Sequence, residues 1–572
     1  MRRERGTVAR LYRRFMAAER SATTARERRL LLETLLLGAV GAVSAVVFQL
    51  LLEGVQHVLL FGLAGYKPPG LPAEGGVPSQ VIGGFGLWLV PFATTVGGIL
   101  VGLLVTWGAP EAEGHGTDTV VRAFHRSGGA LRARVPPVKL LASALTIGSG
   151  GSGGREGPVA LISAGLGSTY ARWRGLSEDD TRLLLLIGMS AGLAAIFRSP
   201  VGTALFAIEV LYWGMDFEAR ALLYTTLASV VAYALSGVFL GWEPLFRVPV
   251  SLQAPAISQY GWYAILGVAA GIVGTLIPEV FYRMRDLFRR LPVRAMWRPA
   301  IGGFLTGCLA LVVPEVIGGG YGWVQEAIDG RLPVVTLAAL VVAKPIALAF
   351  TVSSGGSGGV FAPTLFVGGM LGGLLGVTFH MPAPAFVVVG MAAVFAGAAR
   401  VPFATMMMVM EMTGGYRLFV PAALAVTISY IVQNRLADVF RYHSLYEAQV
   451  RNRAASPAHR TEHLRLALKL LRERTGPLPK DIGRIDLVML VQSGIPVDLP
   501  EGRQLTMTSL STTDPRVGKM LDGSLRHDGG KEVLAVIREK TMLRPGAEVQ
   551  LQAGDELLLL SQAEARKEGK AD

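Results

Sequence analysis

The feature that most constrains this chain is a glycine-rich stretch that occurs twice within its apolar part. Residues 148–158 read Gly-Ser-Gly-Gly-Ser-Gly-Gly-Arg-Glu-Gly-Pro. Residues 354–363 repeat the Ser-Gly-Gly-Ser-Gly-Gly and the proline, with Val-Phe-Ala in place of Arg-Glu-Gly. Glycine permits tight turns and close backbone approach, and proline suits the first turn of a helix. Each copy therefore predicts a loop that leads into a helix N-terminus.

A helix N-terminus offers unpaired N–H donors and a partial positive charge, which together attract an anion. The first copy adds Glu156 at its helix mouth, whereas the second copy has no acid there. Two such helix ends predict an anion site between two structural repeats.

The composition indicates a protein that crosses a membrane many times. Of 572 residues, 51% are hydrophobic and only 17% are charged, and the mean hydropathy is +0.44. These values are typical of a polytopic membrane protein. Cys308 is the single cysteine, so no disulfide framework exists, and no cysteine–histidine cluster has zinc spacing. We therefore expect no metal and no cofactor.

The net charge of +13 is concentrated at the start of the chain, where residues 1–29 contain ten arginines. An arginine-rich segment directly before a long apolar span indicates a cytoplasmic N-terminus and a retained span rather than a signal peptide. Nucleic-acid binding is the less favoured alternative, because the segment lacks interleaved aromatic residues.

The apolar part, residues 30–450, predicts an all-α polytopic membrane domain with an internal repeat. Long apolar blocks cover residues 30–63 and 81–107, but many others are shorter than the roughly 20 residues of a full crossing, which predicts broken and re-entrant helices. A second signature also repeats, since Pro200 precedes Glu209 by nine residues and Pro402 precedes Glu411 by nine. The spacing alone leaves open whether the halves are inverted.

The remaining chain predicts a linker helix at 451–477 and a small α+β cytoplasmic domain at 478–572, where short alternating stretches are divided by turns.

The membrane part resembles the CLC family of voltage-gated-type chloride channels and chloride/proton antiporters. The residues that carry the resemblance are Gly154-Arg155-Glu156-Gly157-Pro158, Gly359-Val360-Phe361-Ala362-Pro363, Pro137-Val138-Lys139, Glu411-Met412-Thr413 and Ser444-Leu445-Tyr446. The resemblance implies a homodimer in the cell membrane, with one pathway per subunit for chloride or a similar anion.

The resemblance also implies roles for individual residues. Glu156 would be the gate and proton carrier, and Val360, Phe361 and Tyr446 would hold the anion. Further anion-site residues are expected in the two neighbouring motifs, namely His115, Gly116, Arg155 and Gly157. The alternative for Glu156 is a helix-capping ion pair with Arg155.

Two positions depart from the family pattern. His115 stands where a serine often points at the anion; its imidazole either donates to the anion, or faces water while the backbone alone binds. Val210 stands where many exchangers of the family carry an internal proton glutamate, directly after Glu209, which we expect to be a structural acid facing the cytoplasm. We therefore expect a chloride/proton antiporter, with a passive chloride channel as the alternative.

The tail resembles the C-terminal subdomain of the RCK (TrkA-type) potassium-transport regulators, on residues 543–546 and 551–557. The resemblance implies a regulatory or dimerising domain that binds a small molecule such as cyclic di-AMP; a passive stabilising cap is the alternative.

An enzyme is the less favoured class. The Gly-x-Gly-x-x-Gly at 148–153 follows no clear strand of a βαβ unit, and no Gly-x-x-x-x-Gly-Lys-Ser/Thr loop exists. Lys139 and Lys344 lie beside prolines in apolar blocks, where a functional role and snorkelling to the membrane surface are both open.

Overall fold

The computed structural model divides the chain into two units, residues 1–449 and 450–572. It describes residues 2–453 except 85, 250, 251 and 253, and then 456–458, 497–499, 503–510, 514–521, 531–538, 541–543 and 549–562; the side chains of 2–25 are not included. Most of the predicted linker helix at 451–477 and the first part of the predicted tail domain lie outside the described residues. Each unit is considered by itself below.

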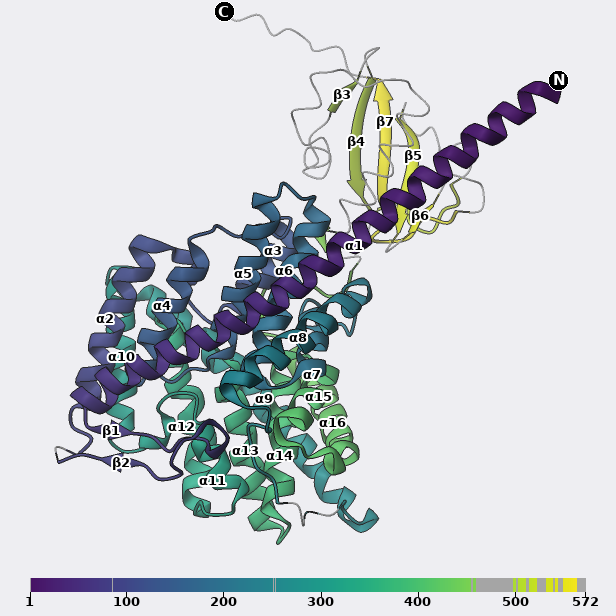
Figure 1. Cartoon of the computed structure of the whole chain (residues 1–572). Coiled ribbons are helices and arrows are strands. Elements are labelled where there is room, and N and C mark those ends of the chain that lie inside the picture. The colour runs from purple at the N-terminus through teal and green to yellow at the C-terminus, as the bar shows by residue number, and fades with distance from the viewer. Residues whose placement is uncertain are drawn as a thin grey trace, which may run out of the picture. The chain divides into compact units, whose positions relative to one another are not determined.

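The described part of the first unit is built from sixteen α-helices (Figure 1). In chain order they form two sets of eight, of which the second begins with a long helix as the first does. The first set is α1 (Arg2–Val55), α2 (Val90–Gly108), α3 (Thr117–Arg126), α4 (Val135–Gly148), α5 (Glu156–Trp173), α6 (Glu178–Phe197), α7 (Pro200–Glu209) and α8 (Leu222–Leu240). The second set is α9 (Tyr260–Arg290), α10 (Arg298–Ala310), α11 (Tyr321–Ile328), α12 (Val334–Ser353), α13 (Phe361–Thr378), α14 (Ala383–Ala399), α15 (Pro402–Thr413) and α16 (Phe419–Ala437).

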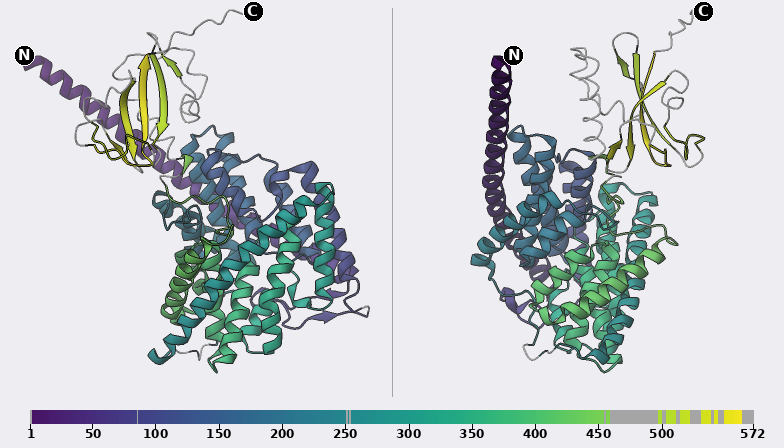
Figure 2. Two further views of the ribbon diagram at one scale, coloured as in Figure 1. Left: turned by 180° about the vertical axis from the view of Figure 1, so that it is seen from behind. Right: turned by 90° about the vertical axis from the view of Figure 1, so that its right-hand side faces the viewer.

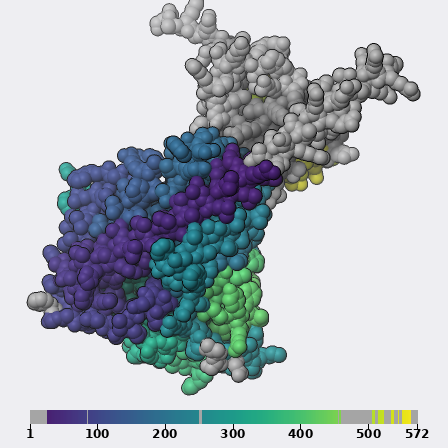
Figure 3. Space-filling model, in the orientation of Figure 1, coloured from purple at the N-terminus to yellow at the C-terminus, as the bar shows by residue number. Residues whose placement is uncertain are grey.

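Eight helical stretches in the described residues are long and apolar enough to cross a membrane, as far as length and composition decide. The first runs from Arg26 to Leu63, where α1 continues into the π-helix η1 (Gln56–Leu63), and it lies across one face of the unit (Figure 3). The shorter apolar helices of the unit include α4, α7 and α14. The expected mixture of full and short helices is therefore present.

One small sheet interrupts the helices. Strands β1 (Tyr66–Lys67) and β2 (Val81–Ile82) pair antiparallel and enclose the short 3-10 turn η2 (Pro72–Glu74). We call residues 66–82 the hairpin. The apolar block predicted at 81–107 therefore begins as hairpin, and its helix starts only at Val90. The hairpin and α11 lie at the end of the unit away from α3 (Figures 1 and 2).

The two sets of helices pack with matching partners. Helix α5 packs on α6 as α13 packs on α14, and α1 packs on α8 as α9 packs on α16. Helix α2 packs against its counterpart α10, and α7 against its counterpart α15. Contacts of equivalent elements across a common centre are what a pseudo-two-fold axis between two halves produces.

Two glutamates, of which Glu209 is buried and Glu411 is partly exposed, join the halves at the α7–α15 contact. Glu209, at the end of α7, accepts hydrogen bonds from the backbone N–H groups of Phe403 (3.1 Å) and Ala404 (2.6 Å) at the start of α15. Glu411, in α15, accepts from Val201 (3.1 Å) and Gly202 (2.8 Å) at the start of α7. Each acid therefore caps the partner helix. Glu209 therefore has the structural role expected for it, and its side chain is fully buried rather than exposed at a surface.

The described part of the second unit contains an antiparallel sheet in the order β3-β4-β7-β5-β6. Its strands are β3 (Val497–Leu499), β4 (Arg503–Ser509), β5 (Lys531–Arg538), β6 (Thr541–Leu543) and β7 (Glu556–Gln562). Leu510, Leu551 and Leu557 belong to its apolar core. Asp555 is buried at the turn before β7 and accepts two hydrogen bonds from Arg538, both 2.8 Å long.

Candidate functional site

The two glycine loops meet backbone to backbone in the interior of the first unit. The Gly154 N–H donates to the Gly359 carbonyl (2.7 Å), and the Gly359 N–H donates to the Gly154 carbonyl (2.6 Å). Helix α5 begins two residues after the first glycine, at Glu156, and α13 begins two residues after the second, at Phe361. Two helix N-termini therefore converge at one junction, as the sequence predicted.

On each side of the junction, a serine N–H of one glycine loop donates to a threonine hydroxyl of the other half. The Ser152 N–H donates to the Thr351 hydroxyl (3.0 Å), while the Ser357 N–H donates to the Thr146 hydroxyl (3.1 Å). Each pair lies 205 residues from its counterpart. Because donor and acceptor change places between the halves, the pseudo-two-fold axis passes through this junction.

Two buried lysines bind the segments that lead into α3 and α11. The Lys139 ammonium donates to the carbonyls of Ala112 (3.0 Å) and Gly114 (2.6 Å). The Lys344 ammonium donates to those of Val316 and Gly318, both at 2.8 Å. Neither lysine is exposed, so neither snorkels to a surface. In the described residues their hydrogen-bond partners are backbone carbonyls rather than carboxylates.

A third loop, residues 114–116, packs against the junction. Gly116, with φ 89°, precedes α3, and a methyl group on it would lie 2.6 Å from the Gly157 carbonyl oxygen. A methyl group on Gly157 would collide with the His115 carbonyl oxygen. The predicted site residues His115, Gly116, Glu156 and Gly157 are therefore held together by backbone contacts that only glycine permits.

The Glu156 carboxylate is buried at this junction. Its residue is 1% exposed, and its oxygens face the backbone N–H groups of Arg155, Glu156 and Ala362 without a hydrogen bond of normal geometry. Its Oε1 lies 4.0 Å from Nε of Arg155. The Arg155 guanidinium instead donates to Gln49 (2.7 Å) and Glu74 (2.5 Å). The ion pair between Glu156 and Arg155 that was considered as the alternative is therefore present only at 4.0 Å, and the shorter contacts of Arg155 go to Gln49 and Glu74.

The side chains of the remaining predicted residues lie on one side of the junction. The Tyr446 ring centroid is 5.6 Å from that of His115 and 6.3 Å from that of Phe206. Phe206 in turn lies 6.0 Å from Phe361. Val360 forms the N-cap of α13 and is buried. Sequence reasoning missed Phe206, because nothing in the apolar pattern of α7 distinguishes it from a core residue.

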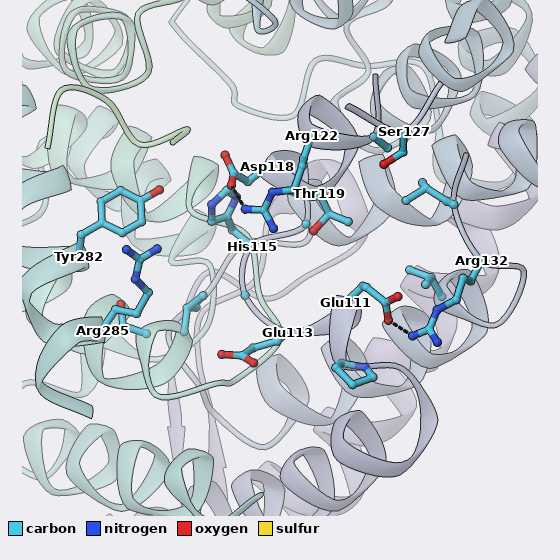
Figure 4. A pocket seen from close by; sticks show the side chains of 18 of the residues that line it. Glu111, Glu113, His115, Asp118, Thr119, Arg122, Ser127, Arg132, Tyr282 and Arg285 are labelled. Carbon is cyan, nitrogen blue, oxygen red and sulfur yellow. Dashed lines mark hydrogen bonds and ion pairs between the residues drawn. The ribbon is translucent and has the colours of Figure 1, made fainter. Parts of the chain in front are cut away.

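A cavity of about 350 Å³ reaches this group from one end of the unit (Figure 4). We call it the exit-side cavity, because residues 445–448, which lead out of the first unit, are bonded to its lining residues. Its lining residues include His115, Asp118, Arg122, Tyr282 and Arg285. His115 is 6% exposed, with Nδ1 unpartnered in the described residues, so it does not face bulk water but borders the cavity.

Asp118 and Arg285 attach that outgoing segment to the cavity wall. Asp118 accepts from the Ala448 N–H (2.7 Å), and Arg285 donates to Glu447 (2.5 and 2.9 Å). Asp118 therefore connects α3 with the segment that carries Tyr446.

A second cavity, of about 470 Å³, reaches the junction from the hairpin and α11. We call it the hairpin-side cavity. It touches the first glycine loop, the hairpin and the segment that leads into α11, with a lining that includes Glu53, His57, Glu74, Gly153, Arg155, Gly318 and Tyr321. Two cavities thus approach one buried junction from opposite ends of the unit, which is the arrangement of a gated pathway.

Comparison with known proteins supports this arrangement. Residues 97–434 match the family described as "Voltage gated chloride channel". The chain is 31% identical over 411 residues to the "Putative chloride channel protein ClcB-like" of Ralstonia nicotianae, covering 69% of this chain and 91% of that protein. It is 31% identical over 351 residues to the "H(+)/Cl(-) exchange transporter ClcA" of Salmonella agona, covering 59% and 74%.

The fold agrees with solved structures. A slow cyanobacterial Cl⁻/H⁺ antiporter shares it with a TM-score of 0.63 and 21% identity, over 73% of this chain and 96% of that one. The family match covers more than half of the chain, and the fold and junction described above are consistent with it. The chain belongs to the voltage gated chloride channel family, the CLC family.

Proposed function

We propose that this protein exchanges chloride for protons across a membrane and that Glu156 is the gate. The observation that carries the proposal is the buried carboxylate of Glu156, which forms no side-chain hydrogen bond in the described residues, at the point where two helix N-termini meet. The relatives named as H⁺/Cl⁻ exchange transporters support the same reaction. Chloride and proton are thus the transported species.

The anion site is formed from weak donors. A bare halide in hydrocarbon costs tens of kcal/mol, and each hydrogen bond to a charged species recovers about 1.5–3 kcal/mol. The backbone at Val360 and Phe361 and the Tyr446 hydroxyl supply donors, and Gly116 and Gly157 allow the third loop to pack closely against the junction. Neutral donors suit transport, because an ion held by a full ion pair would leave too slowly.

His115 and Arg155 add to the site in different ways. The imidazole of His115 borders the exit-side cavity beside Tyr446, where an N–H group donates to an arriving anion. Arg155 is engaged by Gln49 and Glu74, so it acts on the anion through its charge rather than through contact.

Competition couples the two ions. A carboxylate carries the same charge as chloride, so the charged Glu156 side chain and an anion exclude one another from the junction. A proton that neutralises Glu156 releases the position to chloride, and the departure of the neutral side chain toward the hairpin-side cavity carries the proton with it. One acid at a shared position therefore links opposite movements of the two ions.

Proton uptake into liposomes tests the proposal. Vesicles loaded with chloride and diluted into low chloride should take up protons against their gradient as chloride leaves. The Glu156→Gln variant should release chloride without proton movement. Uncoupled chloride release by the wild-type protein would contradict the exchange reaction.

A passive chloride channel is the second candidate, and Val210 favours it. This residue is buried at the end of α7 and offers no titratable group at the position where many relatives carry an internal acid. A channel predicts wild-type chloride flux without any proton movement, together with a reversal potential that follows the chloride gradient alone.

The family and the distribution of charge support a proposal for the oligomeric state and the membrane orientation. We propose a homodimer in the cell membrane, with both termini in the cytoplasm because of the ten arginines before residue 30. Cysteine labelling from each side of sealed vesicles tests the orientation.

We also propose that residues 478–572 form an RCK-like regulatory domain for a small nucleotide such as cyclic di-AMP. The turn at residues 551–557, with the buried Asp555, supports it. Deleting 478–572 should abolish any effect of the nucleotide on flux; unchanged flux and dimerisation would favour a passive cap.

A further inference from the structure

The Arg155 guanidinium lies near two acids on different elements, Glu74 in the hairpin and Glu156 at the start of α5. Its Nη2 lies 2.5 Å from Oε1 of Glu74 in the hairpin, whereas its Nε lies 4.0 Å from the Glu156 carboxylate. That Nε is buried and without a hydrogen-bond partner in the described residues. The arginine beside the gate is therefore held by the hairpin rather than by the gate.

Three elements fix the guanidinium in this position. Gln49 of α1 accepts from Nη1 at 2.7 Å, and its own amide is oriented by Glu53 at 2.6 Å. The Tyr321 ring of α11 lies under the guanidinium carbon at 4.8 Å. With Glu74, these contacts use both terminal nitrogens of Arg155 and cover one face of the guanidinium.

The hairpin turn that presents Glu74 is itself anchored. Arg198 donates to the carbonyl of Ala73 at 3.2 Å and to those of Leu240 and Glu243. Tyr66, fully buried at the start of the hairpin, points its hydroxyl at the Pro314 carbonyl, 3.5 Å away. Glu74 is thus placed by fixed contacts, although its side chain remains 23% exposed to the hairpin-side cavity.

We propose that Glu74 is a positioning residue that holds Arg155 away from Glu156 and so keeps the gate carboxylate free to move. A hydrogen-bonded ion pair with Arg155 would favour the charged, seated form of Glu156 and oppose its protonation. Glu74 diverts the guanidinium from that pair. The inference rests on the proposed role of Glu156 as gate.

Other charged and titratable groups facing this region come from each neighbouring element: Glu53 from α1, His57 from η1, Lys67 from β1, Tyr321 from α11 and Arg198 from the end of α6. Among the described acids Glu74 has the shortest contact with the guanidinium, since Glu53 bonds Gln49 instead. Glu74 is therefore the acid whose removal should act most directly on Arg155.

The test is the pH dependence of chloride efflux from liposomes that contain the full chain. In Glu74→Ala, Arg155 should pair with Glu156, and the midpoint of the pH profile should move by about one unit to lower pH, a tenfold change in proton affinity. Glu74→Gln, which keeps an acceptor but not the charge, should shift less, and it replaces Glu74→Ala if that variant does not fold. Glu243→Gln is the matched control, because its carboxylate pairs with Arg247 on the surface.

A double substitution distinguishes an effect of Glu74 through Glu156 from an effect of Glu74 on the hairpin-side cavity as a whole. If Glu74 acts through the gate, Glu74→Ala should leave the pH profile unchanged when Glu156 is already glutamine. A shift that persists in that background, or a Glu74→Ala profile that superimposes on the wild type, would overturn the proposal. Efflux is measured without a proton gradient, so a failure of proton coupling in the wild type would count against the proposed exchange and not against Glu74.

Discussion

The two glycine loops share one backbone design and differ in the side chains they present. Both loops turn through a glycine with strongly positive φ, at Gly150 (107°) and Gly355 (110°), and both lead into helices that begin at equivalent residues. The first carries Arg-Glu-Gly where the second carries Val-Phe-Ala. The shared backbone builds a symmetric anion site, and the difference places one titratable competitor in only one half. We therefore assign anion binding to the backbone that the two loops share, and gating to Glu156, which only the first loop carries.

The largest expected effect is that of adding a methyl group at Gly157. Its counterpart in the second loop is Ala362, which already carries a methyl group. In the first loop the same methyl would collide with the His115 carbonyl oxygen. Gly157→Ala should therefore prevent stable folding or abolish flux, because backbone atoms cannot repack as side chains do. Size-exclusion chromatography and chloride efflux measure this.

Gly54→Ala is the control for that substitution. A methyl group on Gly54, in α1, would meet no atom within 4 Å. It should purify and transport as the wild type does. Normal behaviour of Gly157→Ala would show that the close approach of the third loop is not required.

Glu156→Gln should remove the functional difference between the halves. In the wild type, chloride affinity should fall as pH rises, because more of the carboxylate is charged and competes for the junction. The glutamine variant should bind chloride with equal affinity across the same range. Calorimetric titration of chloride into the purified protein at several pH values measures this, and a wild-type affinity independent of pH would contradict competition.

The buried lysines should have effects of intermediate size. Lys139→Met or Lys344→Met removes two hydrogen bonds to backbone carbonyls, at a cost of about 1 kcal/mol for each bond. Both variants should unfold at lower temperature than Lys67→Met, which removes an exposed lysine of the hairpin. Lys139→Met should also weaken chloride binding more, because its partner Gly114 precedes His115. Equal chloride affinity in the two buried-lysine variants would show that the loops at Gly114 and Gly318 contribute equally to chloride binding.

His115→Ser should have the smallest effect on chloride flux. It tests a second difference between the halves, the side chain at position 115. The position equivalent to His115 in the second half is Gly319, so only one half presents a side chain there. Replacing imidazole by a hydroxyl keeps a donor and enlarges the site. Flux should persist while the ratio of chloride to bromide or nitrate flux changes by a few-fold; an unchanged ratio would assign binding to the backbone alone.

Features that depend on local pattern were predictable from the sequence. The glycine loops, the helix starts near Glu156 and Phe361, and the division into two halves follow from glycine, proline and apolar periodicity. Contacts between distant segments did not follow. Glu74 meets Arg155 across 81 residues and comes from a loop without periodicity, and Glu209 caps a helix of the other half.

The hairpin shows the same limit. Its two strands are two residues long, too short to give an alternating pattern, so an all-α unit was predicted where a small sheet exists. Pairing of such short strands depends on tertiary anchors such as Tyr66 and Arg198, which the local sequence does not reveal.

The most direct test of the central claim is to locate the anion. Crystals of Glu156→Gln grown in bromide should show an anomalous peak at the junction of the two glycine loops, within hydrogen-bond distance of backbone N–H groups at the start of α13 and beside Tyr446. A second peak at the position vacated by the carboxylate is expected. Bromide found only outside the junction of Gly154 and Gly359 would contradict the claim that the two loops form one anion site.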